Sequence, residues 1–112
     1  MPRAATTTDV FNAIAEPRRR ELIGLLVDGQ NRAVGDLVEA VGLSQPAVSK
    51  HLGVLRKVGI VSVTKHGPLR LYRLEPLQLK PVHDWVKVYE RFWTHNLNRI
   101  KERAEQKAKE KQ

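Results

Sequence analysis

The stretch from Leu43 to Arg56 constrains the fold of this chain more than any other. Ser44 is a typical N-cap residue, because its hydroxyl can accept a hydrogen bond from the first turn of a helix. Pro46 suits that turn, where a backbone N–H would have no partner. Apolar residues then recur at helical spacing and predict one buried face: Val48, Leu52 and Leu55. The other face is polar and suits the DNA major groove, although an ordinary amphipathic surface helix is the alternative interpretation.

Composition bounds the class of protein. The chain has 112 residues, which fits one domain with one core. Lys and Arg total 20 against 12 Asp and Glu, a formal net charge of +8, and a small domain this basic commonly binds a polyanion. The absence of cysteine excludes a disulfide framework and thiolate metal sites. There is no apolar run of about 18 residues and no apolar signal segment at the N-terminus, so we expect a cytoplasmic protein with no membrane partner.

The segments before Leu43 predict three further helices. Apolar residues at helical spacing place them at residues 10–15, 17–27 and 34–41. Gly42 follows the third, where a helix C-terminus favours a residue with positive φ. Two helices joined by a short turn, the second with an exposed polar face, predict a helix-turn-helix.

A β-hairpin is predicted directly after this motif. The β-branched run at 60–65 favours a strand, and residues 69–74 form its partner beyond a loop at 66–68. The expected fold class is therefore mainly α with a small β-hairpin, a winged helix-turn-helix. Cations at the hairpin tip are expected to contact DNA phosphates, the alternative being that they protect an exposed edge strand from aggregation. The residues at or beside the tip are Lys65, His66 and Arg70.

One long helix is predicted from about Pro81 to Ala104. Its apolar stripe carries four of the six aromatic residues of the chain, more than a small domain has room to bury. We therefore expect this helix to pack against its counterpart in a homodimer, with help from the first helix; an apolar ligand pocket at that interface is the alternative. The expected dimer residues are Val10, Phe11, Trp85, Tyr89, Phe92, Trp93, Leu97 and Ile100. The expected organisation is a disordered arm at 1–7, the domain at 8–104 and a charged tail at 105–112.

Three stretches together resemble the ArsR family of winged-helix bacterial repressors. They are residues 10–23 (VFNAIAEPRRRELI), 43–52 (LSQPAVSKHL) and 70–76 (RLYRLEP). Residues 85–93 further resemble a cysteine-free subgroup that includes autorepressors. The resemblance implies a homodimer that binds an imperfect inverted repeat in double-stranded promoter DNA, its own promoter included, and leaves it on an inducing signal that the sequence does not identify.

The resemblance also implies roles for single residues. Base contacts map to Gln45, Ser49 and Lys50, and Gln pairs well with adenine and Lys with guanine. Ser44 and His51 lie nearer phosphates, but His51 has a second possible role, a buried hydrogen bond at the helix–sheet junction. The full expected DNA-binding set is Ser44, Gln45, Pro46, Ser49, Lys50, His51, Arg56, Lys65, His66 and Arg70.

Metal sensing and catalysis are not expected. The C-terminal metal site of the family would here be left with His83, Asp84 and His95, whose spacing departs from the family pattern in two places, so we expect no metal and no cofactor. An enzyme is also not expected, because Ser49, Lys50 and His51 are consecutive and diverge around a helix. The alternative function is a basic architectural DNA- or RNA-binding protein without sequence preference, which competition with bulk DNA would distinguish.

Overall fold

The computed structural model describes residues 9–110, so the predicted disordered arm at 1–7 lies outside it. The chain divides into two compact units, one ending at Pro81 and one beginning at Val82, and each is described by itself. The elements of the first unit are α1 (Val10–Ile14), α2 (Pro17–Leu25), β1 (Arg32–Ala33), α3 (Val34–Val41), α4 (Gln45–Lys57), β2 (Val61–His66), β3 (Leu69–Leu74) and the 3-10 helix η2 (Pro76–Leu79). Next along the chain come α5 (Lys80–Lys87) and α6 (Glu90–Glu110).

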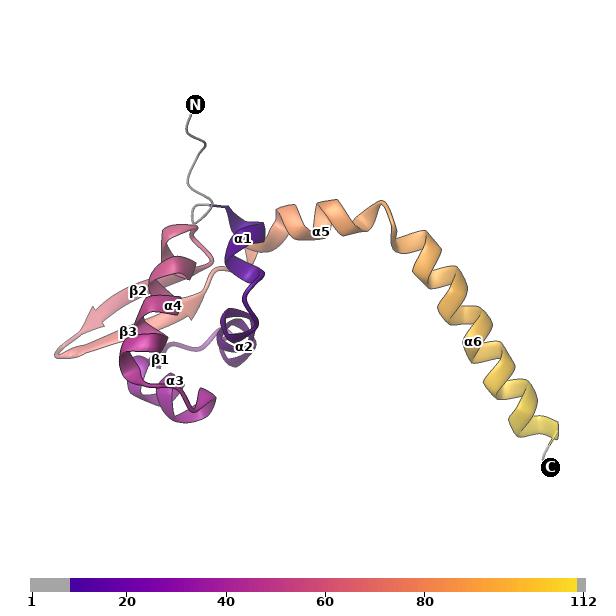
Figure 1. The fold of residues 1–112 in the computed structure, drawn as a ribbon, viewed down its shortest axis with the longest axis horizontal. Helices are drawn as coiled ribbons and strands as arrows, with labels where there is room; N and C mark the ends of the chain where they lie inside the picture. The colour runs from indigo at the N-terminus through magenta and orange to yellow at the C-terminus, as the bar shows by residue number, and fades with distance from the viewer. Residues whose placement is uncertain (1–8, 111–112) are drawn as a thin grey trace. The chain divides into compact units, whose positions relative to one another are not determined.

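The predicted helix-turn-helix and hairpin are confirmed. Helices α3 and α4 are joined at Gly42, whose φ of 71° is the left-handed conformation expected there. Strands β2 and β3 pair antiparallel from Val61↔Leu74 to His66↔Leu69, and the hairpin projects past the helices (Figure 1). The fold is mainly α with a small β-hairpin, as the sequence indicated.

The sheet has a third strand that the sequence did not predict. The two residues of β1 pair with β3, as Arg32↔Tyr72 and Ala33↔Leu71, giving the strand order β1-β3-β2. Arg32 also bridges backwards, donating to the Leu25 carbonyl at 3.0 Å and to the Asp28 carboxylate at 2.6 Å. This two-residue strand forms only because it pairs with β3, which is distant in the sequence, so the residues near it in the chain do not predict it.

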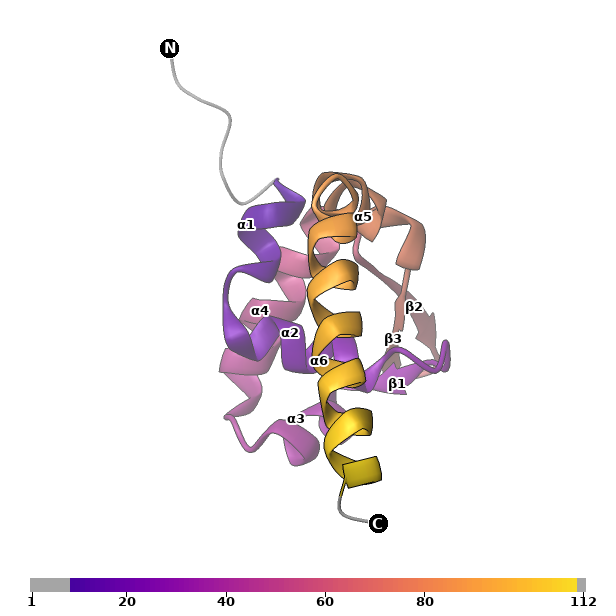
Figure 2. The same ribbon diagram turned by 90° about the vertical axis from the view of Figure 1, so that its right-hand side faces the viewer.

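One core holds the first unit together. Its members are buried side chains from the helices and the sheet: Ala13, Leu22, Leu26, Leu37, Val48, Leu52, Leu55, Ile60, Val61, Tyr72 and Leu74. Three of them come from the inner face of α4, so the core fixes which face of that helix remains outside. Helices α1 to α4 gather beside the sheet in both views (Figures 1 and 2).

Three consecutive arginines in the first turns of α2 satisfy carbonyl groups at the ends of other helices. Arg18 Nη1 donates to the Val41 carbonyl, the last residue of α3, at 3.2 Å. Arg19 donates to two carbonyls near the end of α1, those of Asn12 and Ala13. Arg20 Nη1 donates to the Ile14 and Ala15 carbonyls at 2.7 and 3.1 Å. The last carbonyls of a helix have no partner within it and carry the negative end of its dipole, so all three cations serve the fold.

The prediction of one continuous helix over 81–104 is wrong. The helix is interrupted at Val88 and Tyr89, between α5 and α6. The Tyr89 N–H donates to the Val86 carbonyl at 2.9 Å, a tight three-residue turn instead of a four-residue helical one. Glu90 then lies in the first turn of α6, where a carboxylate favours the positive end of the helix dipole. Among the described residues, no helix combines the length and the apolar character needed to cross a membrane.

Candidate nucleic-acid interface

The N-terminus of α4 is built as predicted. Ser44 is the N-cap, and its Oγ accepts a hydrogen bond from the Ala47 N–H at 3.3 Å. Pro46 occupies the first turn. At the end of α3, the Gly42 N–H donates a hydrogen bond to the Val38 carbonyl at 3.0 Å. Capping at both sides of this short turn fixes the angle at which α4 leaves α3.

The outer face of α4 is continuous and polar. Successive residues turn by about 100° around a helix, which places the buried Val48, Leu52 and Leu55 on one side. The exposed residues on the other side form what we call the outer face: Gln45, Pro46, Ser49, Lys50, Gly53, Arg56 and Lys57. Five of these belong to the predicted DNA-binding set. Lys57 was missed, although it follows Lys50 by seven residues and therefore lies on the same side.

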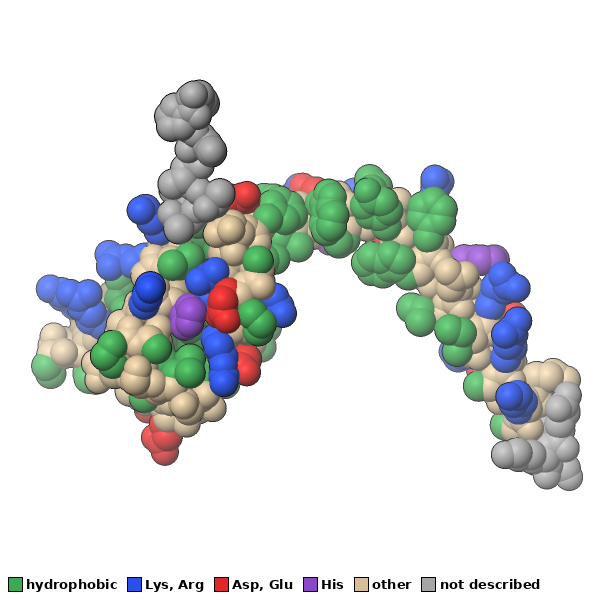
Figure 3. All heavy atoms as spheres, in the orientation of Figure 1, with side chains coloured by type: hydrophobic (Ala, Val, Ile, Leu, Met, Phe, Trp, Pro, Cys, Tyr) green, Lys and Arg blue, Asp and Glu red, His purple; other side chains and the backbone are tan. Residues whose placement is uncertain are grey.

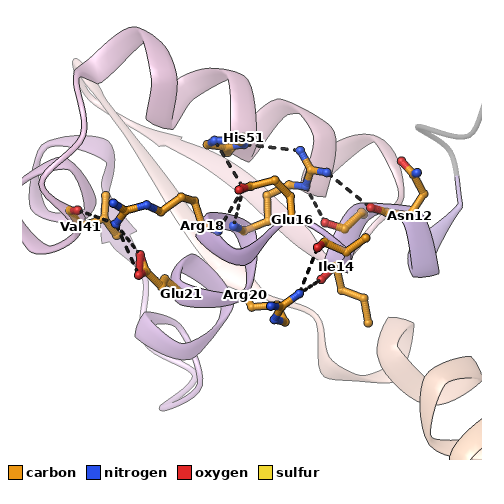
Figure 4. A network of polar contacts seen from close by, with 11 residues as sticks. Asn12, Ile14, Glu16, Arg18, Arg20, Glu21, Val41 and His51 are labelled. Atoms are coloured by element: carbon orange, nitrogen blue, oxygen red, sulfur yellow. Dashed lines mark hydrogen bonds and ion pairs between the residues drawn. The ribbon is translucent and has the colours of Figure 1, made fainter.

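His51 does not lie on the outer face. Its side chain is only 20% exposed, and its Nε2 atom lies 3.6 Å from Glu16 Oε2. Its Nδ1 atom lies 3.4 Å from Nη1 of Arg19. Figure 4 shows Glu16 between His51 and the first turn of α2. The suggested hydrogen bond at the helix–sheet junction is therefore wrong in its location, because the polar contacts of this ring are with α2 and its N-cap.

Glu16 is an anchored carboxylate at the start of α2. As the N-cap it accepts from the N–H groups of Arg18 and Arg19 at 3.0 and 3.3 Å. Burial raises the pKa of Glu16, but these two N–H donors and nearby positive charge, including that of Arg19, outweigh burial and leave the pKa below its ordinary value. The carboxylate thus stays charged beside the His51 ring.

The tip of the β2–β3 hairpin concentrates positive charge. Lys65 and Arg70 face each other directly across the two strands, with His66 next to them, and all three are exposed. No ion pair joins either cation to another residue within 9–110. Like charges directly opposite one another destabilise a strand pair, so this arrangement favours an external anion, such as a phosphate, as the partner.

The base of the hairpin differs from its tip. Glu75 Oε2 accepts from Ser62 Oγ at 2.6 Å and from Arg73 at 3.4 Å. The Ser62 hydroxyl and Arg73 lower the pKa of Glu75 against the opposing effect of burial. The Glu75 N–H also donates to the Ile60 carbonyl at 2.7 Å. Arg73 is thus paired within the fold, which separates it from the tip cations.

The second unit presents apolar side chains on its surface. Its exposed large hydrophobic residues, each between 47% and 63% exposed, are Trp85, Val88, Tyr89, Phe92, Trp93, Leu97 and Ile100. Apolar spheres gather along α5 and the first half of α6, and Lys and Arg follow on the second half (Figure 3). In the first unit, Phe11 on α1 is 39% exposed and Val10 is half-buried.

No group of three or more side chains suited to a metal ion occurs within residues 9–110. His83 and Asp84 are adjacent on α5, and His95 lies on α6; all three are exposed.

Comparison with known proteins gives a consistent result. Residues 16–63 match the family model described as "Bacterial regulatory protein, arsR family". The transcriptional repressor SdpR of Bacillus subtilis is 33% identical over 70% of this chain and 86% of its own length. The HTH-type transcriptional regulator Rv2034 of Mycobacterium tuberculosis is 36% identical over 78% of each chain. Among solved structures, the repressor BigR from Xylella fastidiosa superposes with a TM-score of 0.57 at 30% identity, covering 75% of this chain and 84% of its own.

Proposed function

Because the chain belongs to the ArsR family of bacterial regulatory proteins, we propose that it represses transcription as a homodimer bound to an inverted-repeat operator. Family membership makes it a sequence-specific DNA-binding regulator with a winged helix-turn-helix fold. The observation that carries the proposal is the outer face of α4, which is polar and exposed while the opposite face is locked in the core. A rigid helix with a free polar face suits the major groove.

The proposed base contacts come from Gln45, Ser49 and Lys50 on the outer face. Gln offers a donor and an acceptor to adenine, and Lys donates to the two acceptors of guanine. Arg56 and Lys57, farther along the helix, suit phosphates beside the groove, as do the cations of the hairpin tip. Ser44 and Pro46 remain in the proposed DNA-binding set because both are exposed at the start of α4, beside Gln45. For His51, the contacts with Glu16 and Arg19 support a structural role instead of DNA contact.

The proposed dimer rests on the apolar stripe of α5 and α6. Within α6, Trp93, Leu97 and Ile100 follow at intervals of four and three residues, the spacing by which one helix packs against another. Exposed patches of this kind on a monomer usually mark an interaction site. A second copy of the chain is the proposed occupant, with Val10 and Phe11 of α1 contributing. Such a dimer supplies the two α4 helices that an inverted repeat requires.

Selection from a random duplex library, followed by competition, tests this function. The purified protein should enrich one sequence and prefer it to a scrambled duplex of the same length by roughly 10³-fold or more. Arg70→Ala should weaken binding to both duplexes and lower the salt dependence by about one phosphate contact. Arg73→Ala, on the same strand but paired with Glu75, is the matched control and should change neither.

Equal affinity for the selected and scrambled duplexes would instead indicate the architectural alternative. The protein's own promoter is the first natural fragment to test, and the assay should be run at a physiological salt concentration. The relatives named as repressors support the choice of a promoter.

A further inference from the structure

Arg19 contacts two helices besides its own. From α2 it donates through Nε and Nη2 to the Ala13 and Asn12 carbonyls of α1, while Nη1 lies 3.4 Å from His51 Nδ1 on α4. The planar guanidinium offers donors in fixed directions, so one side chain can meet both partners at once. Lysine has a single point charge and no such geometry.

The His51 ring is held from its other side as well. Arg19 has no acceptor atom, so its contact requires Nδ1 to accept, and in the neutral ring Nε2 then carries the proton. That N–H faces Glu16 Oε2 at 3.6 Å, and the same oxygen is fixed by two backbone N–H groups of α2. The lowered pKa of Glu16, where N–H donors and nearby charges outweigh burial, agrees with a carboxylate held in this place. The ring therefore cannot turn without breaking a contact to α2.

His51 directly follows Ser49 and Lys50 on α4, so the contacts of its ring with α2 add to the core packing that sets the rotation of the outer face. On the basis of the function proposed above, we propose that Arg19 is a positioning residue, which joins α4 to the end of α1 through His51. Helix α1 carries Val10 and Phe11, the residues assigned to the dimer contact. The path from dimer contact to base contact is then α1, Arg19, His51 and the outer face.

The test compares Arg19→Lys with Arg20→Lys. Arg20 also donates to α1 carbonyls from α2, but none of its hydrogen bonds reaches α4, which makes it a matched control. Binding is measured on the duplex that the wild type selects and on its scrambled counterpart, at a temperature where circular dichroism shows every variant folded. Arg19→Lys should lose about tenfold in affinity for the selected duplex, the effect of one lost hydrogen bond to a charged group. Binding to the scrambled duplex should change by less than about twofold, and Arg20→Lys should stay within about twofold on both.

Variants of His51 provide the second arm. His51→Ala should lose as much as Arg19→Lys, and the double variant should lose no more than either single one, because both remove the same link. His51→Asn places an oxygen near the position of Nδ1 and should recover most of the affinity. If Arg19→Lys does not fold, the comparison of His51→Ala with His51→Asn still tests whether the contact at Nδ1 positions the outer face.

Three results would overturn the inference. A folded Arg19→Lys with unchanged affinity and a lower melting temperature would mean a purely structural role. A loss on both duplexes with His51→Ala, unaffected by Arg19, would mean direct phosphate contact. A wild type without preference between the duplexes would refute the proposed function itself, which separates that failure from the other two.

Discussion

Gln45 and Lys50 are exposed on the outer face of α4, and neither is hydrogen-bonded to another side chain within 9–110. Replacing either by Ala should therefore leave the free energy of unfolding nearly unchanged, as for most surface substitutions. Binding to the selected duplex should weaken by about 1–3 kcal/mol, with a relaxed base preference at one position. Titration by fluorescence anisotropy against single-base variants of the duplex measures both effects.

Lys57→Ala is the comparison at the far end of the same face. As a proposed phosphate contact it should weaken all duplexes alike. If Gln45→Ala and Lys50→Ala also weakened all duplexes alike, or had no effect, the assignment of base contacts to these two side chains would be wrong.

The carboxylate of Glu16 makes stability depend on pH. Its pKa is lowered in the folded protein, since its N–H donors and neighbouring charges outweigh burial, from an ordinary value of 4.5. A lowered pKa stabilises the fold above the unfolded-state pKa, and that stability is lost as the pH falls through the folded-state pKa. Glu16→Gln keeps an acceptor oxygen but cannot titrate. The variant should be less stable than the wild type near neutral pH, and the difference should shrink as the pH falls through and below 4.5.

Urea unfolding at a series of pH values measures this difference. Asp28 and Glu75 also have lowered pKa values, the first through the Gln30 N–H and the second through the Ser62 hydroxyl. Both remain in the variant, so acid should still destabilise it. Parallel curves for the two proteins would show that Glu16 has the same pKa in the folded and unfolded chains.

At the scale of elements, two glycines predict opposite responses to alanine. Gly24 lies inside α2, and a Cβ built there meets nothing within 4 Å, so Gly24→Ala should raise the free energy of unfolding by about 0.5–1 kcal/mol. Gly42 has the same open space but a φ of 71°. Gly42→Ala should lower stability by about 1–2 kcal/mol, because an L-residue is strained in that conformation.

Thermal unfolding compares the pair directly. An equal response to the two substitutions would mean that backbone conformation does not control the α3–α4 turn, and the rigid placement of α4 would lose its explanation.

The elements that the sequence predicted correctly are those with local signals. The cap at Ser44, the stop at Gly42 and the apolar spacing of α4 each depend on residues within a turn or two. The β-branched run of β2 works in the same way. These signals were enough to place most of the outer face and the hairpin tip. The family model, which matches residues 16–63, includes the outer face and ends before the tip.

The features that were missed arise from contacts between distant segments. Strand β1 exists only through pairing with β3. Arg18 reaches the end of α3, 23 residues away, and His51 meets Arg19 across 32 residues. A sequence pattern shows that a side chain is polar, but not which helix end or ring it will meet. The break between α5 and α6 was missed for another reason: the apolar spacing continues across it, while the turn itself is local.

At the scale of the whole molecule, Leu97 tests the dimer. It is 61% exposed, so Leu97→Glu should not destabilise the single chain. In a dimer it would place a charge in an apolar interface, where an unpaired charge is costly. Sedimentation velocity should show the wild type as a dimer and Leu97→Glu as a monomer at micromolar concentration.

Val27 offers a control for that measurement. It is 72% exposed and belongs to the first unit, whereas the apolar stripe belongs to the second. Val27→Glu should remain dimeric. A wild type that sediments as a single chain, or a Leu97→Glu variant that stays dimeric, would contradict the proposed interface.

The most direct test of the account is the footprint of the protein on its selected duplex. Two α4 helices, related by a two-fold axis, should protect two inverted half-sites whose centres lie roughly 10–10.5 base pairs apart, or a multiple of that spacing. Hydroxyl-radical footprinting at single-nucleotide resolution measures this spacing. One isolated half-site, or protection without any repeat, would contradict the central claim that two copies of this chain bind DNA together.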